Sequence, residues 1–159
     1  MSKYFCWLLV IGWVLGIAYF SGQSSSKQDL RPFIEAHPAV VKVVREMPHV
    51  SFYYADRLVD NYKDPVQFIQ MFIRKLVHFT IYGCLGILLL LATGGLKRLT
   101  PGRWILIGLL LLGVAAVDEF NQFLTPSRTG CIEDVIVDVS AYVLFGLVFV
   151  GTCQSSYAK

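Results

Sequence analysis

Four long apolar stretches, separated by polar segments, dominate the pattern of the chain. They cover residues 4–22, 72–93, 102–124 and 132–153. A helix needs about 20 largely apolar residues to cross the hydrocarbon core of a bilayer, so each stretch predicts one membrane-spanning helix. The first could also be a signal sequence, but its apolar run exceeds the roughly 7 to 15 residues of a typical signal core. The pattern therefore predicts an all-α integral membrane four-helix bundle, a single domain over residues 1–159.

Capping signals predict where the second and third spanning helices begin. The pairs Asp64–Pro65 and Thr100–Pro101 each combine an N-cap residue with a proline in the first turn. Gly94–Gly95 is typical of a helix C-terminus. A helix from Pro65 to these glycines would exceed the bilayer core by roughly 10 Å. We therefore expect its first turns to stand in the interfacial layer.

The segment between the first two spans, residues 23–71, carries nearly half of the charged residues and is predicted to lie on the extracytoplasmic side. Apolar residues recur at helical spacing in two places, Val40, Val41 and Val44 in the first and Tyr54, Leu58 and Tyr62 in the second. These patterns indicate one or two short amphipathic helices lying on the membrane surface.

Polar residues interrupt the end of the third stretch. Its purely apolar part, Trp104 to Val117, is too short to cross a bilayer alone. The crossing must therefore include Asp118, Glu119 and Gln122. An ionisable residue at such a depth costs several kcal/mol unless it is paired or hydrated, which makes these residues the first candidates for function.

Helical spacing predicts that polar residues from three spans meet in one pocket. Side chains three, four or seven residues apart share a helix face, and antiparallel neighbours return to the same membrane surface. We expect a ligand-binding pocket formed by Arg74, Lys75, His78, Tyr82, Asp118, Glu119, Gln122, Arg128, Asp134 and Asp138. Among them His78, Glu119 and Asp118 are candidate catalytic acids or bases.

Composition narrows the class of protein without identifying a reaction. The chain is 55% hydrophobic and only 16% charged, as expected of a membrane protein. Its net charge of +3 is small and its basic residues are scattered, so the charge does not indicate a nucleic-acid partner. His78 with carboxylates could bind a metal ion, but the neighbouring cations favour a pocket without one, and no cofactor is expected. Three interpretations remain open: a binding pocket for an anionic headgroup, an intramembrane enzyme acting on an envelope lipid, and a purely structural charge network.

The basic residues favour a cytoplasmic location for both termini. The loop from Lys97 to Arg103 is rich in cations and contains no acid, which is typical of a cytoplasmic loop. The simple count of Lys and Arg favours the opposite orientation, because residues 27–64 also carry cations. We give the acid-free loop more weight, since the cations of that segment are balanced by acids.

Three motifs together resemble the VanZ-like family, named for a teicoplanin-resistance protein of Gram-positive bacteria. They are FSGQSSS after the first span, RKLVHFTIYGCLG from Arg74 to Gly86, and DEFNQFLTPSRTGCIEDVIVD from Asp118 to Asp138. The resemblance implies functional roles for Lys75, His78, Tyr82, Asp118, Glu119, Gln122, Arg128 and Asp134. The chain departs from the family pattern at Asp138, where the family usually has Asn, and at Ala141, where it usually has Gly.

The resemblance implies a multi-pass protein of the cytoplasmic membrane and the cell envelope, with a link to teicoplanin resistance. Combined with the polar pocket, it predicts as partner a membrane lipid, a lipid-linked cell-wall precursor or a lipoglycopeptide. It implies no particular reaction and no oligomeric state.

Overall fold

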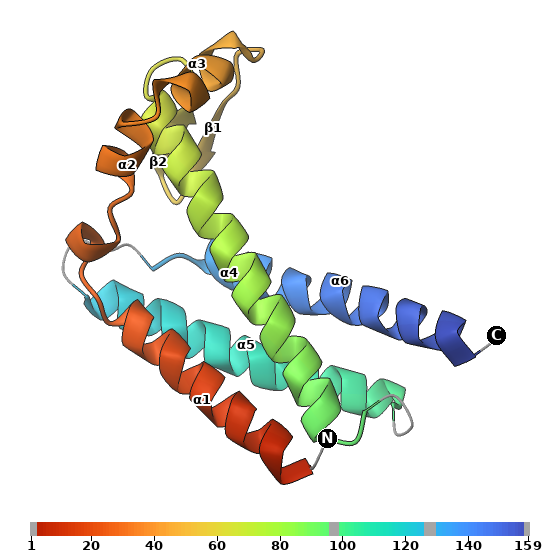
Figure 1. Ribbon diagram of the computed structural model, residues 1–159. Helices are drawn as coiled ribbons and strands as arrows, with labels where there is room; N and C mark the ends of the chain where they lie inside the picture. Colours follow the sequence, from red (N-terminus) through yellow and green to blue (C-terminus); the bar gives the residue numbers. More distant parts are fainter. Residues whose placement is uncertain (1–2, 96–98, 126–129, 158–159) are drawn as a thin grey trace.

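The computed structural model describes residues 3–95, 99–125 and 130–157 of the chain. Four helices are long and apolar enough to cross a membrane. They are α1 (Lys3–Ser21), α4 (Pro65–Ala92), α5 (Pro101–Leu124) and α6 (Ile132–Tyr157), and α4 contacts the other three (Figure 1). The predicted all-α membrane bundle is confirmed.

A small cap, residues 25–64, lies at one end of the bundle. It consists of η1 (Ser25–Gln28), α2 (Arg31–Glu35), α3 (Pro38–Glu46) and the antiparallel strands β1 (Ser51–Tyr54) and β2 (Arg57–Asp60). Helix α4 continues beyond the ends of the other spans, and the cap packs around this extension (Figure 1). The first turns of α4 are thus held by protein contacts.

The helix predicted from Tyr54, Leu58 and Tyr62 is wrong, because β1 and β2 form a hairpin there. Ala55 and Asp56 connect the strands with φ angles of 49° and 59°, as a two-residue hairpin turn requires. The aromatic sequence of β1 favours a strand, and its residues alternate between exposed and half-buried. The other predicted surface helix is present as α3.

Hydrogen bonds at the helix ends confirm the predicted caps. The side chains of Asp64 and Thr100 each accept a hydrogen bond from the backbone amide three residues later, at 2.9 and 3.3 Å. At the end of α4 the Gly95 amide donates to the Leu90 carbonyl at 2.8 Å, and Gly95 has a φ of 62°. Arg103 completes the hydrogen bonding at the C-terminus of α4, since its guanidinium donates to the carbonyls of Leu90 and Gly95.

The carboxylate of Asp60 organises the base of the hairpin. It accepts hydrogen bonds from the backbone amides of Tyr62 and Lys63, at 2.8 and 2.9 Å, and lies 3.1 Å from His49 Nε2. The Lys63 amide is the largest cause of a lowered pKa, which falls from 3.8 to about 2 for Asp60. Buried Asn61 beside it bridges to the α3 end by donating to the Val44 carbonyl. The cap is therefore a hydrogen-bonded unit.

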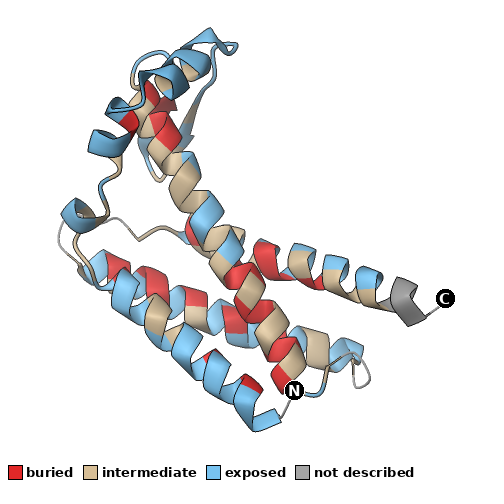
Figure 2. Cartoon of the chain, in the orientation of Figure 1, coloured by how far each residue is buried: buried red, intermediate tan, exposed pale blue. Residues whose placement is uncertain are grey.

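The apolar part of the core lies where α4, α5 and α6 pack most closely. Tyr142 fills a notch over Gly86, and its hydroxyl donates to the Trp104 carbonyl at 2.9 Å. Phe145 lies in the same way over Gly83. Figure 2 shows buried residues following α4 along the crossing with its neighbours, while the outer faces of the spans are exposed, as expected where lipid would cover them.

Candidate functional site

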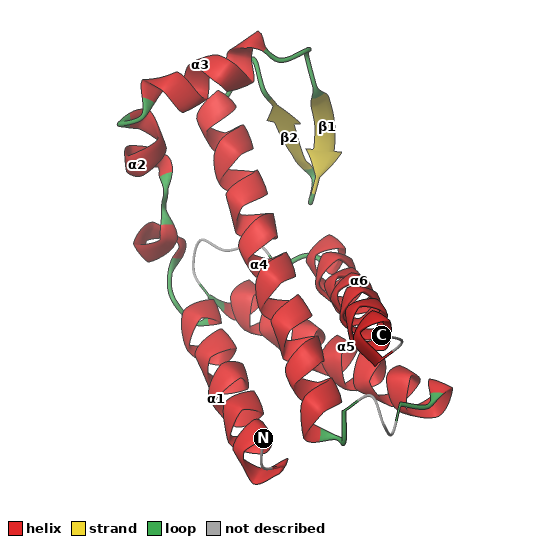
Figure 3. Ribbon diagram, turned by 45° about the vertical axis from the view of Figure 1, so that its right-hand side comes forward, coloured by secondary structure: helices red, strands yellow, loops and turns green. Residues whose placement is uncertain are grey.

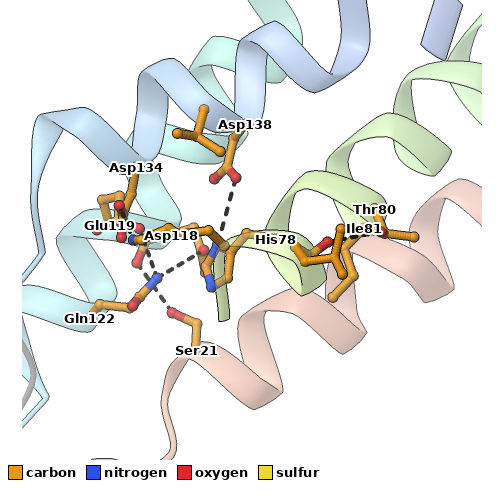
Figure 4. A network of polar contacts seen from close by, with 12 residues as sticks. Ser21, His78, Thr80, Ile81, Asp118, Glu119, Gln122, Asp134 and Asp138 are labelled. Carbon is orange, nitrogen blue, oxygen red and sulfur yellow. Dashed lines mark hydrogen bonds and ion pairs between the residues drawn. The ribbon is translucent and has the colours of Figure 1, made fainter. Parts of the chain in front are cut away.

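The predicted polar residues meet where α4 crosses the cap-proximal ends of α5 and α6 (Figure 4). Helix α4 contributes Lys75, His78 and Tyr82, α5 contributes Asp118, Glu119 and Gln122, and α6 contributes Asp134 and Asp138. We refer to these eight residues as the polar cluster. The structure therefore brings together most of the candidate set, while Arg74 lies beside it and Arg128 lies outside the described residues.

Two ionic contacts connect α4 to α6 within the cluster. The Lys75 ammonium forms a hydrogen-bonded ion pair with Asp134. One helical turn further on, His78 Nδ1 lies 3.6 Å from Asp138 Oδ1. A carboxylate behind an imidazole is an arrangement that can orient the ring and support proton transfer. Two residues three positions apart on α4 thus lie opposite two residues four positions apart on α6.

Tyr54, at the tip of the hairpin, is a site residue that the sequence did not reveal. Its hydroxyl donates a hydrogen bond to Asp134, and the Lys75 ammonium lies 4.6 Å from the centre of its ring. Burial, followed by the hydrogen bond to the neighbouring carboxylate, raises the pKa of Tyr54, so the phenol stays protonated as a donor. The cap is therefore connected directly to the polar cluster.

On α5, Gln122 holds two carboxylates in place. Its Nε2 donates to Asp118 Oδ2 at 3.1 Å and to Glu119 Oε1 at 2.9 Å. The Cys131 amide donates to the other oxygen of Glu119, at 3.0 Å. The Gln122 side chain therefore orients both acids, and the Cys131 backbone amide orients Glu119 as well.

Several buried atoms of the cluster have no hydrogen-bond partner among the described residues. They are both carboxylate oxygens of Asp138, Oδ1 of Asp118, the hydroxyl of Tyr82 and Nδ1 of His78. Asp138 is 0% exposed, Tyr82 1% and Asp118 5%. A buried polar group without a partner costs about 1 to 3 kcal/mol, so these atoms are strong candidates for contact with a ligand.

The same region concentrates negative charge. One ligand atom each from His78, Asp118, Glu119 and Asp138 lies within 4.8 Å of all the others. At that separation two carboxylates repel each other by about 3 to 4 kcal/mol with an effective dielectric constant near 20. The arrangement needs a compensating positive charge, from protons, a cation or a cationic group.

Helix α1 closes one side of the cluster through its last turn. Ser21, buried at the end of α1, donates to the Asp118 carbonyl at 3.1 Å and accepts from Asn121 Nδ2 at 3.2 Å. Trp13 Nε1 donates to the Ile81 carbonyl at 3.0 Å. Ser21 belongs to the FSGQSSS motif, so the sequence contained a signal for this residue without assigning it a contact.

A groove of about 790 Å³ runs between α1 and α4 and reaches the cluster. Its apolar wall consists of Leu8, Leu9, Trp13, Ile17, Phe20, Ile73, Val77 and Ile81. Lys27 and Arg74 line its cap-proximal end, and neither forms an ion pair with a described residue. His78 and Asp118 line the groove as well as the cluster. The groove is therefore apolar along α1 and cationic near the cap.

Comparison with protein families identifies the group to which the chain belongs. The family model described as VanZ/LLP1 matches residues 5–152, nearly the whole chain. The chain belongs to the VanZ/LLP1 family. No curated protein and no solved structure matches it. In this VanZ/LLP1 protein the matched residues include the groove, the polar cluster and the whole cap, so the family relationship extends over every part of the site.

Proposed function

We propose that this VanZ/LLP1 protein binds a membrane amphiphile in the groove between α1 and α4. The hydrocarbon chain would lie along the apolar wall, and a phosphate-bearing headgroup would lie at Lys27 and Arg74. The observation that carries the proposal is the shape of this groove, which combines unpaired cations at one end with an apolar wall of eight side chains.

The cations support an anionic headgroup. A guanidinium such as that of Arg74 donates two parallel hydrogen bonds to a phosphate, and Lys27 would add a mobile positive charge at the rim. Both lie at the cap-proximal end, where α1 and η1 meet. Hydrogen bonds to charged groups contribute about 1.5 to 3 kcal/mol each, enough to select a phosphate over a neutral headgroup.

The α1 side of the groove supports an elongated hydrocarbon chain. Gly12 and Gly16 both line it, and no atom lies within 4 Å of the position that a Cβ would occupy at either residue. Trp13, held by its hydrogen bond to Ile81, forms a fixed wall between them. Two glycines on one helix face thus leave room that larger side chains would fill.

Orientation and location form part of the same proposal. We place both termini on the cytoplasmic side of the cytoplasmic membrane and the cap on the outer side, as the acid-free loop from Lys97 to Arg103 favours. The groove would then open at the outer leaflet. Ligands with the required chemistry at that surface are an anionic phospholipid, a lipid-linked cell-wall precursor and a lipoglycopeptide.

Lipid analysis of the purified protein tests the proposal. Wild type and Arg74→Gln are purified in mild detergent, and their lipids are extracted and quantified by mass spectrometry as phosphorus per chain. We expect a phosphate-bearing lipid with wild type and about tenfold less with Arg74→Gln, because losing one charge-assisted hydrogen bond costs about 1.4 kcal/mol or more. Arg45→Gln, an exposed cation on α3, is the matched control and should retain the lipid. Equal lipid in all three proteins would contradict the proposal.

The lipid that is recovered distinguishes the ligand sources. A diacyl chain indicates a bulk phospholipid, and an isoprenoid chain with a pyrophosphate indicates a wall precursor. A third experiment tests whether the ligand is a lipoglycopeptide. Wild type or Arg74→Gln is expressed at matched membrane levels in a teicoplanin-sensitive Gram-positive host, and the susceptibility of the host to teicoplanin is measured. Protection by wild type alone supports an envelope role for the groove, and equal protection would assign the phenotype to another surface.

A further inference from the structure

We propose that His78, Asp118, Glu119 and Asp138 form a binding site for a divalent transition-metal ion. We refer to these four residues as the quartet. One donor atom from each lies within 4.8 Å of the others, and the residues come from three different helices. The site lies beside the lipid groove. Its four ligands are different residues from Lys27 and Arg74, which are proposed to bind the headgroup.

The donor set indicates the class of ion. One imidazole nitrogen with three carboxylate oxygens suits Zn²⁺, Mn²⁺ or Fe²⁺, whereas Mg²⁺ and Ca²⁺ favour sites built entirely from oxygen. The quartet contains no thiolate, which a site for a soft ion such as Cu(I) would require. A first-row divalent ion is therefore the expected ligand.

The distribution of charge supports a cation at this place. The sequence predicts that Arg74, Lys75 and Arg128 neutralise these acids, and Arg128 lies outside the described residues. In the structure the Lys75 ammonium binds Asp134, which lies outside the quartet, and Arg74 lines the groove. Among the described residues, no Lys or Arg forms an ion pair with any of the three carboxylates. A divalent ion would supply the missing charge.

Unpartnered buried oxygens provide a second, independent observation. Asp138 is fully buried: among the described residues its Oδ2 has no partner, and its Oδ1 has the 3.6 Å ionic contact with His78 and no hydrogen bond. Its side chain points toward His78 in Figure 4. Oδ1 of Asp118 on α5 is also buried and has no hydrogen-bond partner among the described residues. Buried carboxylate oxygens are normally paired or bound to a metal, and these face a shared centre.

Supporting hydrogen bonds orient the acids, as the outer contacts of metal sites commonly do. Gln122 binds Asp118 Oδ2 and leaves Oδ1 of that residue for a ligand. Gln122 and the Cys131 amide each bind one oxygen of Glu119. We therefore assign Gln122 as a positioning residue for two of the metal ligands.

The spacing of the quartet is close to that of a coordination sphere. His78 Nδ1 and Asp138 Oδ1 are 3.6 Å apart. Adjacent ligands of a tetrahedral ion with bonds of about 2.1 Å lie about 3.4 Å apart. Side-chain adjustments of less than about 1 Å would complete the sphere around one ion.

Metal analysis of the full-length protein tests the site. Protein carrying an affinity tag without histidine is purified in a phosphate-free detergent buffer, stripped with chelator, and equilibrated with Zn²⁺ or Mn²⁺. We expect one ion per chain and a loss of affinity of about tenfold or more in Asp138→Asn. Glu133→Gln, which changes an acid on the same helix outside the quartet, should bind like wild type.

A spectroscopic measurement on wild type covers the case in which Asp138→Asn fails to fold. Pulsed electron paramagnetic resonance of the Mn²⁺-loaded protein should detect one directly bound imidazole nitrogen, which disappears in His78→Gln. The proposal would be overturned by a spectrum that shows Mn²⁺ with oxygen ligands only. It would also be overturned if Glu133→Gln and Asp138→Asn reduce metal uptake equally.

The metal site and the lipid groove can fail separately. Gly16→Leu fills the groove without changing a quartet residue, so it should abolish lipid retention and leave the Zn²⁺ content unchanged. Asp138 does not line the groove, so Asp138→Asn should lose Zn²⁺ and retain lipid. Loss of both ligands in both folded variants would contradict the assignment of two distinct sites.

Discussion

The two halves of the contact between α4 and α6 are built in opposite ways. Toward the end of α4, aromatic rings fill notches over glycines, with Tyr142 against Gly86 and Phe145 against Gly83. One to two turns closer to the cap, the same helices face each other through Lys75 with Asp134 and through His78 with Asp138. The first half is apolar and in direct contact, whereas the second contains buried charges and unpartnered atoms.

The two halves of this helix pair differ in the electrostatic cost of their packing. Close packing of apolar groups stabilises a bundle at no electrostatic cost, whereas buried charges cost free energy unless they are compensated. A chain selected only to fold would extend the ring-and-glycine packing along the whole contact. We infer that the polar half is retained for ligands, and the variants below test each half.

The largest effect on stability is expected for Lys75→Met. This change removes the cation that pairs with the buried Asp134 carboxylate and leaves it the hydrogen bond from the Tyr54 hydroxyl. Breaking a buried ion pair from one side costs about 3 to 5 kcal/mol, and we expect the lower figure because Lys75 is partly exposed. Unfolding by denaturant titration in detergent measures the change.

The double variant Lys75→Met/Asp134→Leu is the control. It removes both charges, so most of the lost stability should return. If the single variant is as stable as wild type, this ion pair does not hold α4 to α6.

A smaller loss is expected from Gly86→Ala in the apolar half. The new Cβ would lie 2.5 Å from Cδ2 of Tyr142, a buried ring fixed by its hydrogen bond to Trp104. Overpacking of this kind costs about 1 to 3 kcal/mol. Gly113→Ala on α5 has no atom within 4 Å of its Cβ and should be stabilised by about 0.5 to 1 kcal/mol. Opposite signs in the same unfolding assay are expected, and equal signs would show that α6 can shift away.

Tyr54→Phe should have a weaker effect, because Lys75 continues to neutralise Asp134. Loss of one hydrogen bond to a charged group is expected to lower the free energy of unfolding by about 1 kcal/mol. Hydrogen exchange of the hairpin should increase more than that of α6, since the bond connects the two. Tyr53→Phe, at a position 76% exposed, is the matched control. Identical exchange in both variants would exclude a tie between cap and cluster.

The smallest effect concerns pH and is confined to the cap. The pKa of Asp60 falls from 3.8 to about 2 in the folded protein. A lowered pKa means that this carboxylate stabilises the hairpin fully above pH 4 and loses its contribution as the pH falls toward 2. The protection of the β1 and β2 amides, that is, their exchange relative to the intrinsic rate at each pH, should therefore fall over this interval. Asp60→Asn should remove the pH dependence, and a change centred well above pH 4 would assign it to another group.

Local signals in the sequence determine much of the bundle. Asp64 and Thr100 cap helices because a side-chain oxygen reaches an amide three residues away, which depends on no distant contact. Helical spacing likewise places His78 near Asp138, once successive spans are assumed to alternate in direction, so that α4 and α6 run parallel. These predictions succeed because the relevant interactions are separated by a few residues or by one helix repeat.

The remaining features depend on contacts between distant segments. Tyr54, Leu58 and Tyr62 fit a helical period, but the backbone turn at Ala55 and strand pairing override that pattern. The contact of Tyr54 with Asp134 joins residues 80 positions apart. Pairing of cations with particular acids also requires three-dimensional positions. Arg128, the remaining predicted cation, lies outside the described residues.

Native mass spectrometry of the protein released from detergent tests the central claim most directly, namely that the groove holds one phosphate-bearing lipid. Wild type is compared with Gly16→Leu, which fills the groove, and with Gly113→Leu, which adds the same side chain to an open face of α5. Wild type and Gly113→Leu should each retain one lipid of defined mass per chain, and Gly16→Leu should retain none. Equal retention by all three proteins would show that the lipid binds elsewhere and would contradict the account.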